Sequence, residues 1–317
     1  MEVAVAGHPK GGVGSGMPDA YAPHRDFIRP AQHVTHPRHI VAVVATFLTA
    51  FFVFPVVLMV VLPATARDAF YDGITPIATM AQFGIFGLSA WVFVVALRRV
   101  HGRGFWSLIG PYQAAWSDCR KTAVSVGVIL LITQVILPLG SWGQPAETRN
   151  IGLWLVLLPL AMLVIMIQVT TEEIIFRGYL QQQLACLSAN PWIWMVVPSL
   201  LFGIWHFWNA NSAAEGMVYV FWATLLGLAC ADLTARTGNL GAAIGLHFAN
   251  NFTAIMFIGT QDWPMSGLAL ILYPYHDPDV LSAEIAEVMG LWLAFSMAIA
   301  ALSVLIIWLT ARISLKK

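Results

Sequence analysis

The chain has 317 residues, of which 59% are hydrophobic and only 10% are charged, whereas a soluble domain usually has about 25% charged residues. This composition predicts a membrane protein. The 16 basic and 16 acidic residues balance, so no bulk positive charge favours nucleic acid as a partner. The three cysteines are far apart and form no CxxC motif, which argues against a disulfide framework or a thiolate metal site.

Residues 1–38 are polar and rich in Gly, Pro and His, which predicts a disordered cytosolic tail. Eight apolar segments follow, most of them near the ~20 residues that a membrane-spanning helix needs. We therefore expect an all-α polytopic membrane helical bundle with about eight transmembrane helices and a buried polar cavity. The predicted spans are 40–62, 74–97, 122–139, 151–169, 192–208, 217–231, 240–258 and 288–309.

The loops between these spans predict an orientation, because Lys and Arg concentrate in cytoplasmic loops. With eight spans and the N-terminus inside, all but two of the 16 basic residues lie on the cytoplasmic side, and the exceptions are Arg67 and Arg149. Both termini are therefore expected in the cytoplasm. The apolar segment 263–275 is short and contains Pro264 and Pro274, which indicates an interfacial or re-entrant piece and not a ninth span.

A few polar side chains lie within the predicted spans. An ionisable group in lipid is costly unless it is paired or hydrated, so each one is a functional-site hypothesis. Three of them directly follow the apolar part of the fourth span, the others lie in the fifth and seventh spans, and one is an amide. The candidates are Glu172, Glu173, Arg177, His206, His247 and Asn251.

Helical spacing separates the two carboxylates of the fourth span. Glu173 and Arg177 are four residues apart, which predicts an ion pair that could simply lock helices together. Glu172 points about 100° away around the helix and has no local cationic partner, so it can act as a base or an acid. At ~1.5 Å per residue, Glu172 and the two histidines lie at similar depths, which favours a single buried polar site.

Three motifs occur in order: EExxxR at 172–177, FxxxH at 202–206 and HxxxN at 247–251. With these motifs the chain resembles the CPBP family, which contains the type II CAAX prenyl endopeptidases and bacterial Abi-type or bacteriocin-immunity proteins. The resemblance covers about residues 150–260. It implies an eight-helix membrane fold around a water-filled cavity.

The resemblance also implies an activity, namely an intramembrane endopeptidase that hydrolyses peptide bonds without a covalent intermediate. Glu172 with His206 would activate a water molecule, while His247 and Asn251 would stabilise the oxyanion. The EExxxR ion pair would be structural or would help to position the substrate. Substrates would be CAAX-type prenylated peptides or other membrane-associated peptides, and the Abi-type likeness favours a bacterial plasma membrane.

Two hydrolytic mechanisms stay open at this point. A Zn²⁺ ion held by Glu172, His206 and His247 would leave an open position for water. However, the HExxH motif is absent, and an asparagine beside the second histidine suits hydrogen bonding better than zinc ligation. A site without a metal cofactor is therefore favoured.

Two other classes of function remain as alternatives. A proton-coupled transporter also uses buried Glu and His residues, but the broken helices in two matching halves that typify transporters are not evident. A non-catalytic immunity or scaffold protein would keep the fold for binding a partner. On the protease reading, the chain divides into the tail 1–38, N-terminal transmembrane helices 39–150, a catalytic core 151–260, and an outer loop with the last transmembrane helix 261–317.

Overall fold

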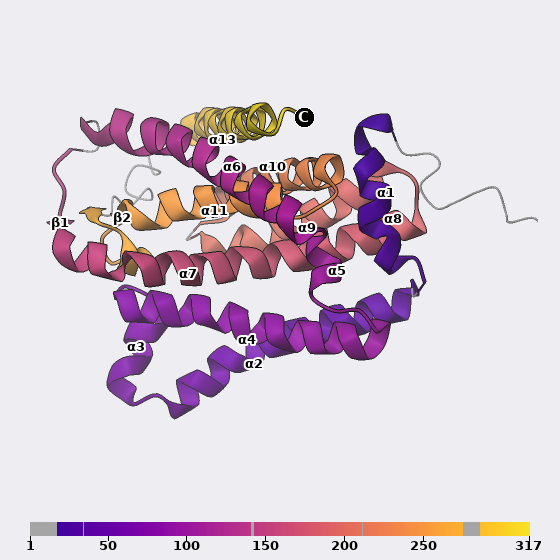
Figure 1. The fold of residues 1–317 in the computed structure, drawn as a ribbon. Helices are drawn as coiled ribbons and strands as arrows, with labels where there is room; N and C mark the ends of the chain where they lie inside the picture. The colour runs from indigo at the N-terminus through magenta and orange to yellow at the C-terminus, as the bar shows by residue number, and fades with distance from the viewer. Residues whose placement is uncertain (1–17, 34, 141–142, 211, 275–285) are drawn as a thin grey trace, which may run out of the picture.

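The computed structural model describes residues 18–33, 35–140, 143–210, 212–274 and 286–317. These residues form an all-α bundle whose long helices run side by side (Figure 1). Six helical segments in the described parts are long and apolar enough to cross a membrane. They are α2 (Pro37–Val61), α4 (Pro76–His101), α6 with η3 (Tyr112–Leu130, Leu131–Ile136), α7 continued through η5 and α8 (Ile151–Ile175, Phe176–Gln181, Gln182–Leu187), α10 (Ala213–Thr237) and α13 (Ala286–Leu315).

The other two predicted spans are helical but shorter than the ~20 residues that a span needs. The fifth consists of the π-helical turn η6 (Trp192–Val196) and α9 (Val197–Trp205). The seventh is α11 (Gly241–Met256), which has 16 residues. The structure thus confirms the polytopic helical bundle, with six full-length apolar helices in the described residues, and each of the two short helices brings one of the predicted site histidines.

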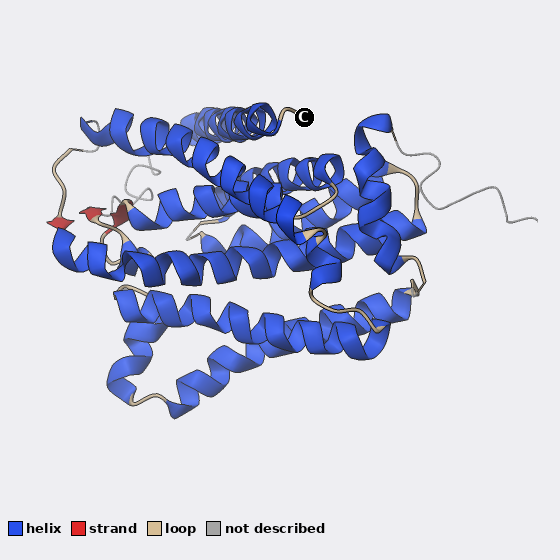
Figure 2. Cartoon of the chain, in the orientation of Figure 1, coloured by secondary structure: helices blue, strands red, loops and turns tan. Residues whose placement is uncertain are grey.

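The remaining elements are short. Three strands lie together at one end of the bundle (Figure 2), where β1 (Glu147–Thr148) pairs antiparallel with β3 (Ile271–Tyr273), and β3 pairs parallel with β2 (Ile258–Thr260). The segment expected to be interfacial or re-entrant contributes β3, and its residue 275 lies outside the described residues. The short helices are η1 (Asp19–Tyr21), α1 (Ala22–Ile28), η2 (Arg29–Ala31), α3 (Ala64–Asp72), α5 (Trp106–Ile109), η4 (Leu137–Gly140), η7 (His206–Asn209) and η8 (Ser266–Leu268).

Residues 18–33 correct the prediction of a disordered tail. They form η1, α1 and η2, and α1 packs against α10 and α8. His24, Phe27 and Ile28 are buried, and their i, i+3, i+4 spacing gives this short helix an apolar face. The polar composition of this segment did not predict the helix, because the helix is stabilised by packing against the bundle. Residues 1–17 and 34 lie outside the described residues.

The outer surface of the long helices is apolar. Val60, Trp91 and Phe295 are 74%, 67% and 66% exposed, although soluble proteins rarely expose large contiguous apolar patches. Such a surface suits lipid and not water. Together with the six long helices, it makes the chain an integral, multi-pass membrane protein.

Helix α11 lies in close contact with α6 because two glycines face that helix. A Cβ atom added at Gly241 would collide with the backbone of Ala115, and one at Gly245 would collide with the carbonyl of Cys119. This spacing is the small-xxx-small pattern that lets membrane helices approach closely. Helix α11 also contacts α7, so its polar residues can reach those of α7.

We expect Gly245→Leu to destabilise the bundle, because the new side chain has no room between α11 and α6. Overpacking of this kind costs about 1–3 kcal/mol or more. Gly84→Leu in α4 is the matched control, since a Cβ there has no neighbour within 4 Å. The measurement is the thermal unfolding midpoint in detergent, and equal midpoints for the two variants would contradict the close packing.

The packing of α1 is expected to depend on pH through His24. Its ring lies 4.6 Å from that of Trp194 and 5.8 Å from that of Phe27, and neither ring nitrogen has a hydrogen-bond partner in the described structure. Burial lowers the pKa of His24 from 6.5 to about 3. As the pH falls below 6.5, His24 therefore binds a proton when the segment is released from the bundle but not when it is packed. The free energy of packing becomes less favourable as a result.

At pH 5 this difference weighs about 2 kcal/mol, since one pKa unit corresponds to about 1.4 kcal/mol. We therefore expect proteolysis within residues 18–33 to accelerate between pH 7 and pH 5 in the wild type. In His24→Phe the rate should stay nearly constant. A wild-type rate that does not change with pH would contradict the assignment.

Candidate functional site

Two adjacent carboxylates lie near the end of α7, just before the π-helical turn η5. Arg177 Nη1 donates to Glu173 Oε1 at 3.0 Å, and both side chains are fully buried. The predicted ion pair is therefore present. π-helical turns often occur at functional sites, and this one begins within the EExxxR motif.

His247 comes from α11 and contacts both carboxylates. Its Nδ1 atom lies 2.8 Å from Glu173 Oε1, and its Nε2 atom lies 3.5 Å from Glu172 Oε2. Because an ionised carboxylate only accepts hydrogen bonds, Nδ1 carries the proton and donates it to Glu173. The Nε2 atom is thus the one turned towards Glu172. This bond gives Glu173 a second contact that the sequence did not reveal.

His206 lies where α9 passes into η7. Its Nδ1 atom is 2.7 Å from the carbonyl oxygen of Phe202, so Nδ1 donates and Nε2 is left for other partners. The ring of Phe202 lies 4.5 Å from the His206 ring and 5.6 Å from the His247 ring. The guanidinium carbon of Arg177 lies 4.5 Å from the same ring. Phe202 therefore joins both histidines to the ion pair.

Asn251 reaches the carboxylates through Gln168. Asn251 Nδ2 donates to Gln168 Oε1 at 3.0 Å, and the Gln168 side chain also lies near the carboxylate of Glu172, one helical turn further along α7. Asn250 Nδ2 donates to Asn251 Oδ1 at 3.1 Å. Sequence reasoning missed Gln168, although a glutamine four residues before Glu172 in an apolar span was a signal for it.

All six predicted site residues thus belong to one cluster. The ion pair and Glu172 contact His247 directly, Asn251 joins through Gln168, and His206 joins through Phe202. Several buried polar atoms of the cluster make no hydrogen bond in the described structure, and they are Glu172 Oε2, Glu173 Oε2 and Arg177 Nε and Nη2. A carboxylate oxygen with free lone pairs beside an imidazole can take up a proton.

The arrangement does not fit the zinc site considered above. Among the residues that the structure describes, no three His, Cys, Asp or Glu side chains gather closely enough to hold a metal ion. Glu172, His206 and His247 are therefore not arranged as a ligand set.

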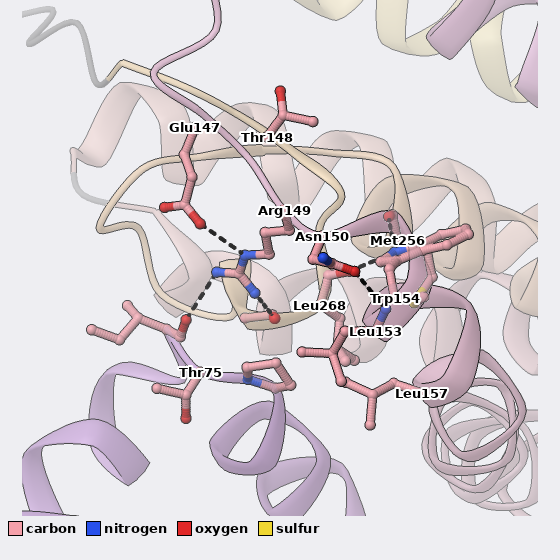
Figure 3. A pocket seen from close by; sticks show the side chains of 13 residues that line it. Thr75, Glu147, Thr148, Arg149, Asn150, Leu153, Trp154, Leu157, Met256 and Leu268 are labelled. Carbon is pink, nitrogen blue, oxygen red and sulfur yellow. Dashed lines mark hydrogen bonds and ion pairs between the residues drawn. The ribbon is translucent and has the colours of Figure 1, made fainter.

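A separate hollow of about 420 Å³ lies at the opposite end of α7 (Figure 3). Arg149 bridges its wall, donating to the carbonyl oxygens of Gly267 and Ile74 and pairing with Glu147 at 3.7 Å. Its lining includes none of the predicted site residues. The hollow therefore belongs to the strand-bearing end of the bundle and not to the cluster.

Comparison with known proteins gives a family for the part of the chain that holds the cluster. Residues 153–253 match the family described as "Type II CAAX prenyl endopeptidase Rce1-like". Uncharacterized protein YyaK of Bacillus subtilis (strain 168) is 32% identical over 182 residues, which cover 55% of this chain and 59% of that relative. No solved structure matches the chain.

The matched range contains all six predicted site residues as well as Gln168 and Phe202. It also agrees closely with the range 150–260 over which the motifs were recognised. The chain is therefore a multi-pass membrane protein, and its residues 153–253 are similar to the Rce1-like family of type II CAAX prenyl endopeptidases.

Proposed function

We propose that the cluster on α7, α9 and α11 hydrolyses peptide bonds with an activated water molecule. In this proposal Glu172 and His206 activate the water, and His247 and Asn251 stabilise the oxyanion. The observation that carries the proposal is the position of Glu172 Oε2, which makes no hydrogen bond in the described structure and lies 3.5 Å from His247 Nε2. Because Nδ1 already carries the proton that is donated to Glu173, Nε2 is a donor when the ring is protonated on both nitrogens. In that form a carboxylate acceptor and an imidazolium donor face the same place.

The hydrogen bonds of the two histidines support different roles. His247 is only 1% exposed and is held by the carboxylate of Glu173, so its Nε2 atom has a fixed direction. Fixed donors in a water-poor site are the most effective stabilisers of a developing oxyanion. His206 is partly exposed and anchored through Nδ1, which leaves Nε2 to exchange protons with water.

The proposed mechanism uses no metal ion. The imidazole of His247 is held by Glu173 and that of His206 by the carbonyl oxygen of Phe202, and these partners suit proton transfer and hydrogen bonding. A zinc mechanism would instead need Glu172 and both histidines to turn towards one point.

The proposed substrates are membrane-associated peptides, including prenylated C-terminal tails. The description of the matching family supports this class, and the lipid-facing exterior suits substrates that arrive within the bilayer. The distribution of basic residues supports a cytoplasmic position for α8 and the start of α11. We propose that substrates approach from the inner leaflet of a bacterial plasma membrane.

We expect Glu172→Gln, His206→Ala and His247→Ala each to lower cleavage at least 100-fold, because each removes a proton acceptor or an oxyanion donor. The assay uses quenched fluorescent peptides, with and without a farnesyl group, and detergent-purified protein. Glu215→Gln at the start of α10 is the matched control and should cleave at the wild-type rate.

Exhaustive chelation of the wild type should leave the rate unchanged, and a rate lost on chelation and restored by Zn²⁺ would overturn the metal-free mechanism. Wild-type rates in the three site variants would refute the site. Absence of cleavage by the wild type would favour the immunity or scaffold alternative.

Glu173 is expected to affect both stability and activity. Glu173→Met leaves Arg177 buried without its partner, which costs about 3–5 kcal/mol. The double variant Glu173→Met, Arg177→Met removes the unpaired charge and should recover most of the lost stability. Its cleavage rate should stay low, because His247 has lost the carboxylate that orients it.

Thermal unfolding and cleavage rates of the three proteins test this expectation together. A double variant that recovers full activity along with stability would show that the Glu173 carboxylate serves stability alone.

A further inference from the structure

Gln168 occupies an unusual place among the polar residues of the cluster. It lies on α7 one helical turn before Glu172, and it is 5% exposed. A buried amide in an apolar helix is costly unless both of its ends are hydrogen-bonded. Here Oε1 accepts a hydrogen bond from Asn251 of α11, and the other end of the amide is near Glu172, which lies four residues on along the same face of α7.

The hydrogen bond to Asn251 and the nearby carboxylate of Glu172 together determine which way the amide of Gln168 points. Its Oε1 atom accepts from Asn251 Nδ2, so the Nε2 group is the end left to donate to the carboxylate of Glu172. Turning the amide over would place an acceptor against an acceptor at Glu172 and a donor against a donor at Asn251. Only one orientation of Gln168 therefore satisfies both neighbours.

The same network fixes the amide of Asn251. Its Oδ1 atom accepts from Asn250 Nδ2 at 3.1 Å, and one of its two Nδ2 hydrogens is given to Gln168. The second Nδ2 hydrogen is the polar group left for a substrate oxygen. If Asn251 turned over, it would offer an oxygen in that place and would repel an oxyanion.

We infer that Gln168 is a positioning residue, which couples the water-activating Glu172 to the oxyanion-stabilising Asn251 and holds both amides in the productive orientation. This inference rests on the proposed function. Gln168 itself does not touch the substrate, so its effect falls on the rate of the chemical step and not on substrate binding.

The test compares Gln168→Met with Gln183→Met. Both replace a buried glutamine of the continuous segment α7–α8 by an apolar side chain of similar length, but Gln183 lies about three turns beyond Glu172. Gln168→Met should lower kcat about 10- to 100-fold, which is less than the loss in kcat expected when an oxyanion donor itself is removed. KM should change less than twofold, and Gln183→Met should keep the wild-type kcat.

Asn251→Ala provides the second arm. If Gln168 acts through Asn251, adding Gln168→Met to Asn251→Ala should lower kcat far less than it does in the wild type. A kcat within twofold of wild type for Gln168→Met, or losses that simply multiply in the double variant, would overturn the inference.

The thermal unfolding midpoints (Tm) of the wild type, Gln168→Met, Asn251→Ala and the double variant test the contact between Gln168 and Asn251 independently of catalysis. A hydrogen bond between the two side chains makes their losses in Tm non-additive, and additive losses would overturn the contact and the inference with it. A wild type that cleaves no peptide would refute the proposed function, whereas a cleaving wild type with an unaffected Gln168→Met would refute only the positioning role.

Discussion

The carboxylate of Glu173 is the point on which the arrangement of the site depends. A charge in an apolar bundle is tolerated only where cations and hydrogen bonds replace water, and here Arg177 at 3.0 Å and His247 at 2.8 Å both bind Oε1. The first contact lies within one helix, but the second joins α7 to α11. Because the second needs one particular register between the helices, it also brings Glu172 opposite His247.

Sequence spacing predicted the contacts within a helix and missed those between helices. The pair Glu173 and Arg177 follows from the 3.6-residue turn, since four residues bring side chains to the same face. The bond from Glu173 to His247 spans 74 positions, and periodicity gives the direction of a side chain around its own helix but not the neighbour that it meets. For this reason the contact of Glu173 with His247 was not predicted, and Gln168 was not noticed.

Hydropathy also did not predict how many of the apolar segments form full-length spans. Helix α11 was predicted as a span because it is apolar, yet residues 241–250 are all buried by other helices. A short apolar helix of this kind belongs to the core of a bundle, and composition does not distinguish a core helix from a lipid-facing one. Likewise α1 is polar in composition, but three of its residues are buried against the bundle.

The short helices have a consequence for the chemistry. A helix that does not reach across the bilayer ends inside the bundle, so α9 ends at His206 beside an exposed turn that contains Trp208, 83% exposed. His247 lies in the middle of a buried helix. The two imidazoles both leave Nε2 free of their anchoring bond, but His247 is the more deeply buried of the two, and the ring of Phe202 lies near both.

This difference in burial favours distinct roles within one site. A proton carrier must exchange with solvent between turnovers, which the edge position of His206 allows. An oxyanion donor must stay fixed while charge develops. His247 is fixed because rotation of its ring would break the hydrogen bond to Glu173. That bond is also one of the contacts that stabilise the buried charge of Glu173. The hydrogen bond between Glu173 and His247 therefore has two effects. It stabilises the buried carboxylate of Glu173, and it holds the proposed oxyanion donor in a fixed orientation.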